Sequence, residues 1–78
     1  MNGIIASGTL AASGNQYIVQ TSNFEGGRYE VIVFEKDSPL FRKAFEPTTA
    51  GYIQCRKWLD TLQELVPPEI HRLASSAG

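Results

Sequence analysis

Cys55 and His71 are the only cysteine and the only histidine of this 78-residue sequence, and they are its one pair of side chains suited to nucleophilic catalysis. That chemistry needs a thiolate within hydrogen-bond reach of a base, and a third group that orients the base. Cys55 falls on the apolar stripe of a predicted helix, where a buried thiol behaves as a small, inert hydrophobic group. His71 follows Pro67 and Pro68 near the end of the chain, where we expect it to be solvated. The sequence therefore predicts that the protein is not an enzyme.

A metal centre, a disulfide and a cofactor site are also disfavoured. One cysteine forms no intrachain disulfide, and one cysteine with one histidine is too small a ligand set for a zinc site. The carboxylates are spread along predicted strands and, at Asp60 and Glu64, on the outer side of the predicted helix, which is typical of a solvated face. Gly26-Gly27 lacks the spacing of a phosphate loop. We expect no catalytic residue, no metal, no cofactor and no small-molecule substrate.

The length of the chain predicts a single small domain. A domain of 78 residues buries only about 60 to 65% of the surface that its unfolded chain exposes. Small folds are usually stabilised further by disulfides, a metal or oligomerisation, and only the last of these is open here. We place the domain at residues 1–74 and expect residues 75–78 to be a disordered tail.

The charges give no sign of a nucleic-acid or membrane partner. Seven basic and eight acidic residues are interspersed, for a net charge of −1, whereas phosphate binding needs a clustered basic surface. No apolar segment approaches the roughly 20 residues that cross a bilayer, and residues 1–8 do not resemble a signal peptide. A soluble protein of the cytoplasm, with one reduced thiol, is the simplest interpretation.

The first half of the sequence alternates between strand-forming runs and turn signals. Ser13-Gly14-Asn15, Gly26-Gly27 and Asp37-Ser38 are turn sequences, and the runs between them are rich in β-branched and aromatic residues. Gly8 is compatible with a bulge in the first run. The predicted strands cover residues 3–12, 16–22, 28–36 and 40–45.

The length of each turn sets which residues pair. A two-residue turn at Gly26-Gly27 places Val19 opposite Phe34, and a turn at Asp37-Ser38 places Phe34 opposite Phe41. A loop one residue longer would turn the next strand over, so the assignment of faces depends on these turns.

A helix follows the strands. Thr48 or Thr49 can cap it, and Gly51 in its first turn costs about 1 kcal/mol against alanine but allows a close approach to the sheet. Pro67-Pro68 ends it. Its apolar stripe consists of Tyr52, Cys55, Leu59, Leu62 and Val66, with Trp58 and Leu65 at the edge. The sequence thus predicts an α+β fold: an antiparallel β-meander of three or four strands, with one main amphipathic helix packed on one face.

Both faces of the predicted sheet are apolar, and one helix covers only one of them. Phe45 immediately precedes the helix connection, which favours its face, with Val19, Ile32, Phe34 and Phe41, as the inner one. An antiparallel sheet with one solvated face should be polar on that face, and an exposed apolar area usually marks an interface. The alternative is that the first strand, the carboxy-terminal tail or a tighter wrap of the chain covers it. The predicted partner-binding residues are Ile18, Gln20, Tyr29, Val31, Val33, Leu40 and Arg42.

These observations predict a small, non-enzymatic protein–protein interaction module, an adaptor or an inhibitor. It would act through its open apolar sheet face or as a homodimer. Small α+β proteins of this length are also common among phage and mobile-element products that block host protein machines, which is an analogy of architecture only. The alternative is a nucleic-acid-binding or nucleoprotein-associated domain that uses the sheet aromatics with Arg28, Arg42 and Lys43.

Overall fold

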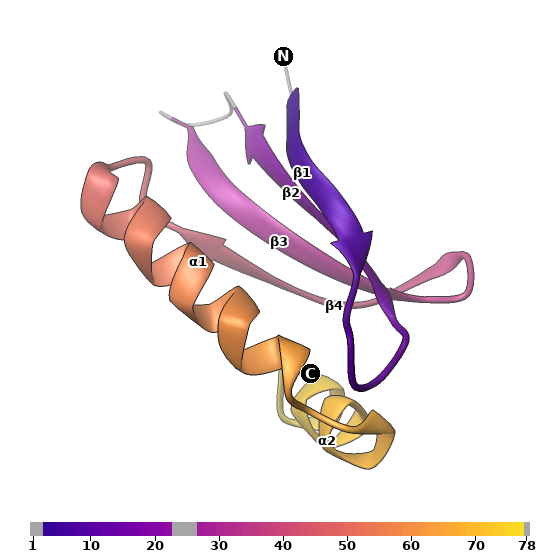
Figure 1. The fold of residues 1–78 in the computed structure, drawn as a ribbon. Helices are drawn as coiled ribbons and strands as arrows, with labels where there is room; N and C mark the ends of the chain where they lie inside the picture. The colour runs from indigo at the N-terminus through magenta and orange to yellow at the C-terminus, as the bar shows by residue number, and fades with distance from the viewer. Residues whose placement is uncertain (1–2, 23–26, 78) are drawn as a thin grey trace.

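The protein is an antiparallel sheet of four strands followed by two helices (Figure 1). The computed structural model describes residues 3–22 and 27–77. The strands lie in the order β1-β2-β3-β4, so the sheet is a simple meander. This arrangement confirms the predicted α+β fold. The elements are β1 (Gly3–Thr9), β2 (Gln16–Ser22), β3 (Arg28–Glu35), β4 (Ser38–Phe45), α1 (Thr49–Gln63) and α2 (Pro67–Ala77).

Thr48 caps α1, as its sequence position indicates. Its backbone is extended (φ −127°, ψ 168°), and its side-chain oxygen accepts a hydrogen bond of 3.0 Å from the backbone N–H of Gly51. The buried stripe of the helix comprises Cys55, Leu59 and Leu62, together with Gly51. Val66, predicted to extend this stripe, is exposed. The reason is that α1 ends at Gln63, before the stripe reaches Val66.

Pro67 begins a second helix instead of only ending the first. Proline suits the first helical position, because its missing N–H would have no intrahelical acceptor there. The side chain of Glu69 accepts a hydrogen bond of 3.2 Å from the N–H of Val66, which is one half of a capping box. Ile70 is fully buried. The helix includes Ser75 and Ser76, where the sequence predicted a disordered tail.

One hydrophobic core lies between the two helices and one face of the sheet (Figure 1). Helix α1 packs on β3 and β4, and α2 contacts β4. Strands β2, β3 and β4 and both helices all supply buried side chains to this core. The buried residues of the core are Leu10, Val19, Val31, Val33, Phe41, Cys55, Leu59, Leu62 and Ile70.

The predicted pairing of β3 with its neighbours is wrong on both sides. Val19 pairs with Val31, not with Phe34, which is a displacement of three residues. Val33, not Phe34, pairs with Phe41, which is a displacement of one. Each displacement is odd, and an odd displacement turns a strand over. Strand β3 therefore presents to the helices the face that was predicted to point outward.

The turns explain both errors. Ser22 pairs with Arg28, so the β2–β3 connection spans residues 23–27 rather than the two residues Gly26-Gly27, and Gly26 itself lies outside the described residues. Between β3 and β4, Glu35 pairs with Ser38, which places the turn at residues 36–37. Lys36 there has a φ of 58°. A lysine in this left-handed conformation gives no turn signal in the sequence.

The β1–β2 connection is attached to the end of α1 through Gln63. The side-chain oxygen of Gln63 accepts a hydrogen bond of 2.7 Å from the N–H of Ala11. The backbone carbonyl oxygen of Gln63 accepts one of 3.1 Å from the N–H of Ala12. Leu10, at the start of this connection, is fully buried. Two backbone donors of the loop thus find acceptors on the last residue of the helix.

Gln63→Ala is expected to destabilise the fold by about 1 kcal/mol, because the Ala11 N–H loses its side-chain acceptor while the helix itself is unchanged. Urea unfolding followed by circular dichroism measures the difference. Gln54→Ala, at an exposed position of the same helix, is the control. Equal midpoints for the two variants would contradict a role for Gln63 in holding the loop.

Candidate functional site

One face of the sheet points away from both helices and is called here the outer face (Figure 1). The strand pairing assigns alternate residues of all four strands to it. The pairing of the strands arranges these residues in three rows across the sheet. The first row is Ile4, Gln20, Glu30 and Ala44, the second is Ser7, Ile18, Ile32 and Arg42, and the third is Thr9, Gln16, Phe34 and Pro39. About half of these side chains are apolar.

Three of the residues predicted to bind a partner lie under the helices. Val31 and Val33 are 0% exposed and belong to the core. Tyr29 shares their face, and its ring lies 5.3 Å from that of Tyr52 on α1, measured between centroids. The prediction that these residues point outward is wrong, because β3 is turned over relative to the predicted register.

The other four predicted residues are divided between the two faces. Ile18, Gln20 and Arg42 belong to the outer face. Leu40 packs against the core. The β3–β4 pairing shifts register between Val33 and Phe34, next to Leu40, and such an irregularity changes which way a side chain points. The structure therefore does not assemble the predicted set on one surface.

Ile32 and Phe34 are outer-face residues that the sequence assigned to the inner face. Ile32 is only 6% exposed, although neither α1 nor α2 lies over it and it is not part of the core cluster. Its cross-strand partners are Ile18 on one side and Arg42 on the other. Neighbouring side chains of this size cover a central residue of a sheet face. Ile32 is thus the centre of a small apolar cluster on the outer face.

Polar side chains cross the same face in an ordered chain. The amide of Gln20 donates a hydrogen bond of 2.8 Å to a carboxylate oxygen of Glu30, and a guanidinium nitrogen of Arg42 lies 3.6 Å from the other oxygen. The Glu30 side chain is mostly buried between them, at 16% exposure. The hydrogen bond from Gln20 and the nearby positive charge of Arg42 offset the charge of Glu30, while the Arg42 side chain itself is 59% exposed. The outer face therefore combines apolar area with internally satisfied polar groups, as protein interfaces do.

A shallow hollow of about 440 Å³ opens at one end of the outer face. Residues of β1, β2 and β3 line its base, and the β3–β4 turn forms one side. This hollow is large enough to receive side chains of a partner. Its lining includes Ser7, Thr9, Gln16, Ile18 and Phe34 of the outer face, and Lys36 of the β3–β4 turn.

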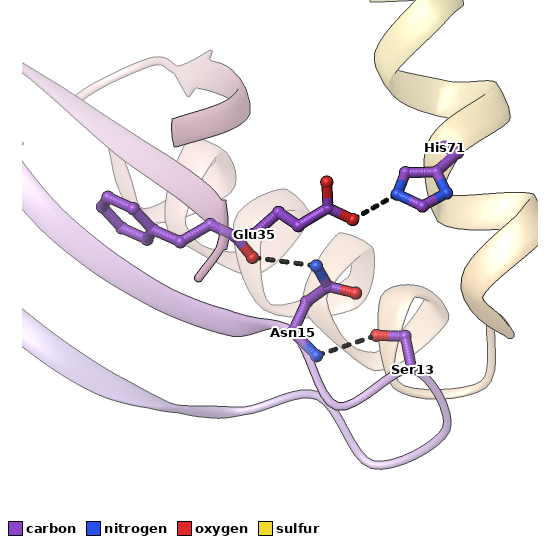
Figure 2. Close-up of polar contacts among 5 residues, drawn as sticks. Ser13, Asn15, Glu35 and His71 are labelled. Atoms are coloured by element: carbon purple, nitrogen blue, oxygen red, sulfur yellow. Dashed lines mark hydrogen bonds and ion pairs between the residues drawn. The ribbon is translucent and has the colours of Figure 1, made fainter. Parts of the chain in front are cut away.

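A polar cluster beside this hollow ties three elements together (Figure 2). His71 of α2 pairs with the carboxylate of Glu35 at the end of β3. The side-chain amide of Asn15 donates a hydrogen bond of 2.8 Å to the carbonyl oxygen of Phe34, and its backbone N–H donates one of 3.2 Å to the hydroxyl of Ser13. The His71 and Glu35 side chains are both half-exposed. We interpret the cluster as a clamp that holds α2 and the β1–β2 loop against β3.

Cys55 and His71, the pair suited to catalysis, occupy different environments. Cys55 is fully buried in the core, and this burial raises the pKa of its thiol, while the positive charge of Arg56 lowers that pKa to a lesser extent. His71 is at the surface against Glu35. A thiol that stays protonated inside the core is a weak nucleophile.

The raised pKa of Cys55 predicts a loss of stability in alkali. An unfolded cysteine ionises at about pH 8.5, and the folded thiol stays protonated to higher pH. The stabilisation is therefore complete below about pH 8.5 and is lost, by up to about 1.4 kcal/mol per pH unit, as the pH rises towards the folded pKa. Urea unfolding at pH 7 and pH 10 should show a larger loss for the natural chain than for Cys55→Ala. An equal loss in both proteins would contradict the raised pKa.

The basic and aromatic residues considered for nucleic-acid binding are divided between the two faces of the sheet. Arg42 is on the outer face beside Glu30, whereas the ammonium of Lys43 lies 5.3 Å from the ring centroid of Trp58 on the helix side. The ring of Phe41 also faces Trp58, at 5.9 Å between centroids. Tyr29, as described above, packs on α1. A stacking platform needs several exposed rings beside a basic groove, whereas these contacts place Tyr29 and Phe41 against α1 and leave Phe34 on the outer face.

Two further geometric findings concern metals and membranes. Across residues 3–22 and 27–77, no three side chains of His, Cys, Asp or Glu come together in a group that could hold a metal ion. Neither helix in this part of the chain combines the length and the apolar character needed to cross a bilayer.

The chain matches no protein family model, no curated protein and no solved structure. The function of the protein is therefore inferred from the geometry of its own residues.

Proposed function

We propose that this protein is a small, non-enzymatic interaction module of the cytoplasm, an adaptor or an inhibitor, which binds a protein through its outer face. One observation carries the proposal: the sheet face that neither α1 nor α2 covers displays a cluster of apolar side chains. Ile4 on this face is 66% exposed, and Ile18 and Phe34 are partly exposed around the buried Ile32. A solvated face of an antiparallel sheet is normally polar, so this composition supports contact with a partner.

The polar residues of the face suit the same role. Binding costs less when the interface side chains are already ordered, and the hydrogen bond between Gln20 and Glu30 orders that pair. The apolar cluster supplies buried area, and the hollow at its end receives protruding side chains. A second copy of the chain and a different protein both satisfy this chemistry. The mass of the complex separates the two cases.

The first test is the molar mass in solution, measured by light scattering over a more than tenfold range of concentration, because dissociation follows mass action. Ile4→Glu and Ile53→Glu make a matched pair: Ile53 is 49% exposed but lies on α1, away from the outer face. If the protein self-associates through the outer face, Ile4→Glu abolishes the association and Ile53→Glu does not. Equal effects of the two substitutions would contradict the proposal.

If the protein is a monomer, the partner is another protein, and site-specific photo-cross-linking tests this case. A photoreactive side chain at Gln16, on the outer face, is expected to give a discrete adduct in the cells that produce the protein, and the adduct should disappear when Ile4→Glu is added. The control is the same group at Arg56, an exposed position of α1. A monomer that gives no adduct from Gln16, or the same adducts from both positions, would overturn the proposal.

A further inference from the structure

Strand β4 forms one edge of the sheet, and α1 runs beside it (Figure 1). Among the described residues its only strand partner is β3. In an antiparallel ladder, every second residue of an edge strand directs its N–H and C=O away from the sheet. Such an edge is a template for a further strand unless side chains or other elements cover it.

A groove of about 560 Å³ lies between β4 and α1. Its strand side is lined by Lys43 and Phe45, which point to the helix side, and by Ala44, which belongs to the outer face. Three consecutive residues of this edge strand therefore line the groove opposite α1. The backbone edge of β4 near Ala44 borders the groove.

The helix side of the groove is a single face of α1. Ala50, Gln54, Lys57 and Thr61 line it, and their spacing of three and four residues places them in one row along the helix. A strand edge that faces one row of a helix is the geometry in which proteins bind extended peptides by strand addition.

The groove is apolar at its base and cationic at its rim. Trp58 packs against Phe45, with 6.0 Å between ring centroids, and both rings are partly exposed. The ammonium of Lys43 lies 5.3 Å from the ring centroid of Trp58 and 5.5 Å from that of Phe45. Lys57 adds a second positive charge, and Glu46 is the one acidic residue of the lining. An occupant with apolar and acidic side chains complements this surface.

We propose that this groove binds an extended, acidic segment of another protein, which adds to β4 as a fifth strand. The backbone of the segment pairs with β4, an apolar side chain rests against Trp58 and Phe45, and carboxylates face Lys43 and Lys57. Of the outer-face rows, the groove shares only Ala44, so a substitution on α1 such as Lys57→Glu tests the groove without changing the outer face.

A second copy of this chain is a poor occupant. Strand β1, the other edge, has the sequence GIIASGT, which carries no acidic side chain to face the lysines. A contact between the β1 of one copy and the β4 of the next would also be heterologous, and would build a ring or an open filament rather than a two-fold dimer. Pairing two copies of β4 brings Arg42 and Lys43 of each copy near those of the other, and like charges across strands repel.

The test is selection from a random-peptide display library against the immobilised full-length chain, followed by affinity measurement on the selected peptides. We expect the selected peptides to be enriched in Asp and Glu. Lys57→Glu should weaken their binding about three- to tenfold, because it replaces an attraction by a repulsion. Arg56→Glu makes the same charge change on the adjacent, exposed residue outside the groove and should alter binding by less. Circular dichroism of both variants verifies the fold.

Amide hydrogen exchange with the bound peptide locates the contact. Strand addition should slow the exchange of amides around Ala44 in β4 and leave those of β1 unchanged. The proposal is overturned if no peptide is selected, if the selected peptides lack acidic residues, or if Lys57→Glu and Arg56→Glu weaken binding equally. Protection of β1 or of the outer face in place of β4 would overturn it as well.

Discussion

Val31→Asp is expected to unfold the protein. Val31 is 0% exposed, lies between Val19 and Lys43 in the sheet, and belongs to the core under α1. Aspartate forfeits about 1.5 to 3 kcal/mol of apolar burial and places a carboxylate in the core, which costs several kcal/mol more. The whole stability of a domain of this length is about 4 to 12 kcal/mol. The substitution therefore removes most or all of it.

The measurement is a thermal and urea unfolding series followed by far-ultraviolet circular dichroism. Thr9→Asp is the control, because it places the same side chain at an exposed position of the same sheet, on the outer face. We expect Thr9→Asp to unfold within about 0.5 kcal/mol of the natural chain. If Val31→Asp kept a cooperative transition close to that of the control, Val31 would not be in the core, and the orientation of β3 described above would be incorrect.

Local patterns were enough to predict the strands themselves. The predicted limits of β2 coincide with the observed ones, and those of β3 and β4 differ by at most two residues. These limits depend on β-branched runs and on turn residues, which act within a few positions of the chain. Pairing depends instead on how many residues each turn uses. A five-residue connection before β3 and a lysine with positive φ after it were not visible in the turn sequences.

One signal in the sequence did favour the observed orientation of β3. Glu30 alternates with Ile32 and Phe34, so placing those two under the helix would have buried a carboxylate as well. In the structure, Glu30 is on the outer face, where Gln20 and Arg42 contact it. Charged groups are rarely buried without a partner, and this cost outweighs the position of Phe45 as evidence about β3. The position of Phe45 correctly predicted which face of β4 points to the helices. The orientation of β3 has to be predicted from the residues of β3 itself.

The second helix was missed because Pro67-Pro68 is compatible with two structures. Proline ends a helix that precedes it and also begins one that follows it. Glu69, two residues after Pro67, favours a helix start there, because its side chain accepts a hydrogen bond from the N–H of Val66. Ile70, Leu73 and Ala74 form the buried or partly buried side of α2. The groove beside β4 also escaped prediction. It depends on where α1 lies relative to a strand edge, and no local pattern encodes that placement.

Gly51→Ala is expected to destabilise the protein by about 3 kcal/mol or more, although alanine is the better helix former by about 1 kcal/mol. A Cβ at Gly51 would lie 2.0 Å from the carbonyl oxygen of Glu46 and 2.8 Å from its carbonyl carbon. Backbone atoms cannot rotate aside as a side chain can. The start of α1 would have to move away from the loop that follows β4, which would strain the Thr48 cap on the N–H of Gly51.

Ala50→Gly is the matched control, because it makes the reverse change one residue earlier at an exposed position of the same helical turn. Helix propensity alone predicts opposite signs for the two substitutions: a gain for Gly51→Ala and a loss of at most about 1 kcal/mol for Ala50→Gly. Contact with Glu46 predicts that both destabilise, with Gly51→Ala by far the more severe. Urea unfolding of the two variants decides between these accounts. A Gly51→Ala protein as stable as the natural chain would show that α1 does not begin against Glu46, and it would remove the wall on which the β4 groove depends.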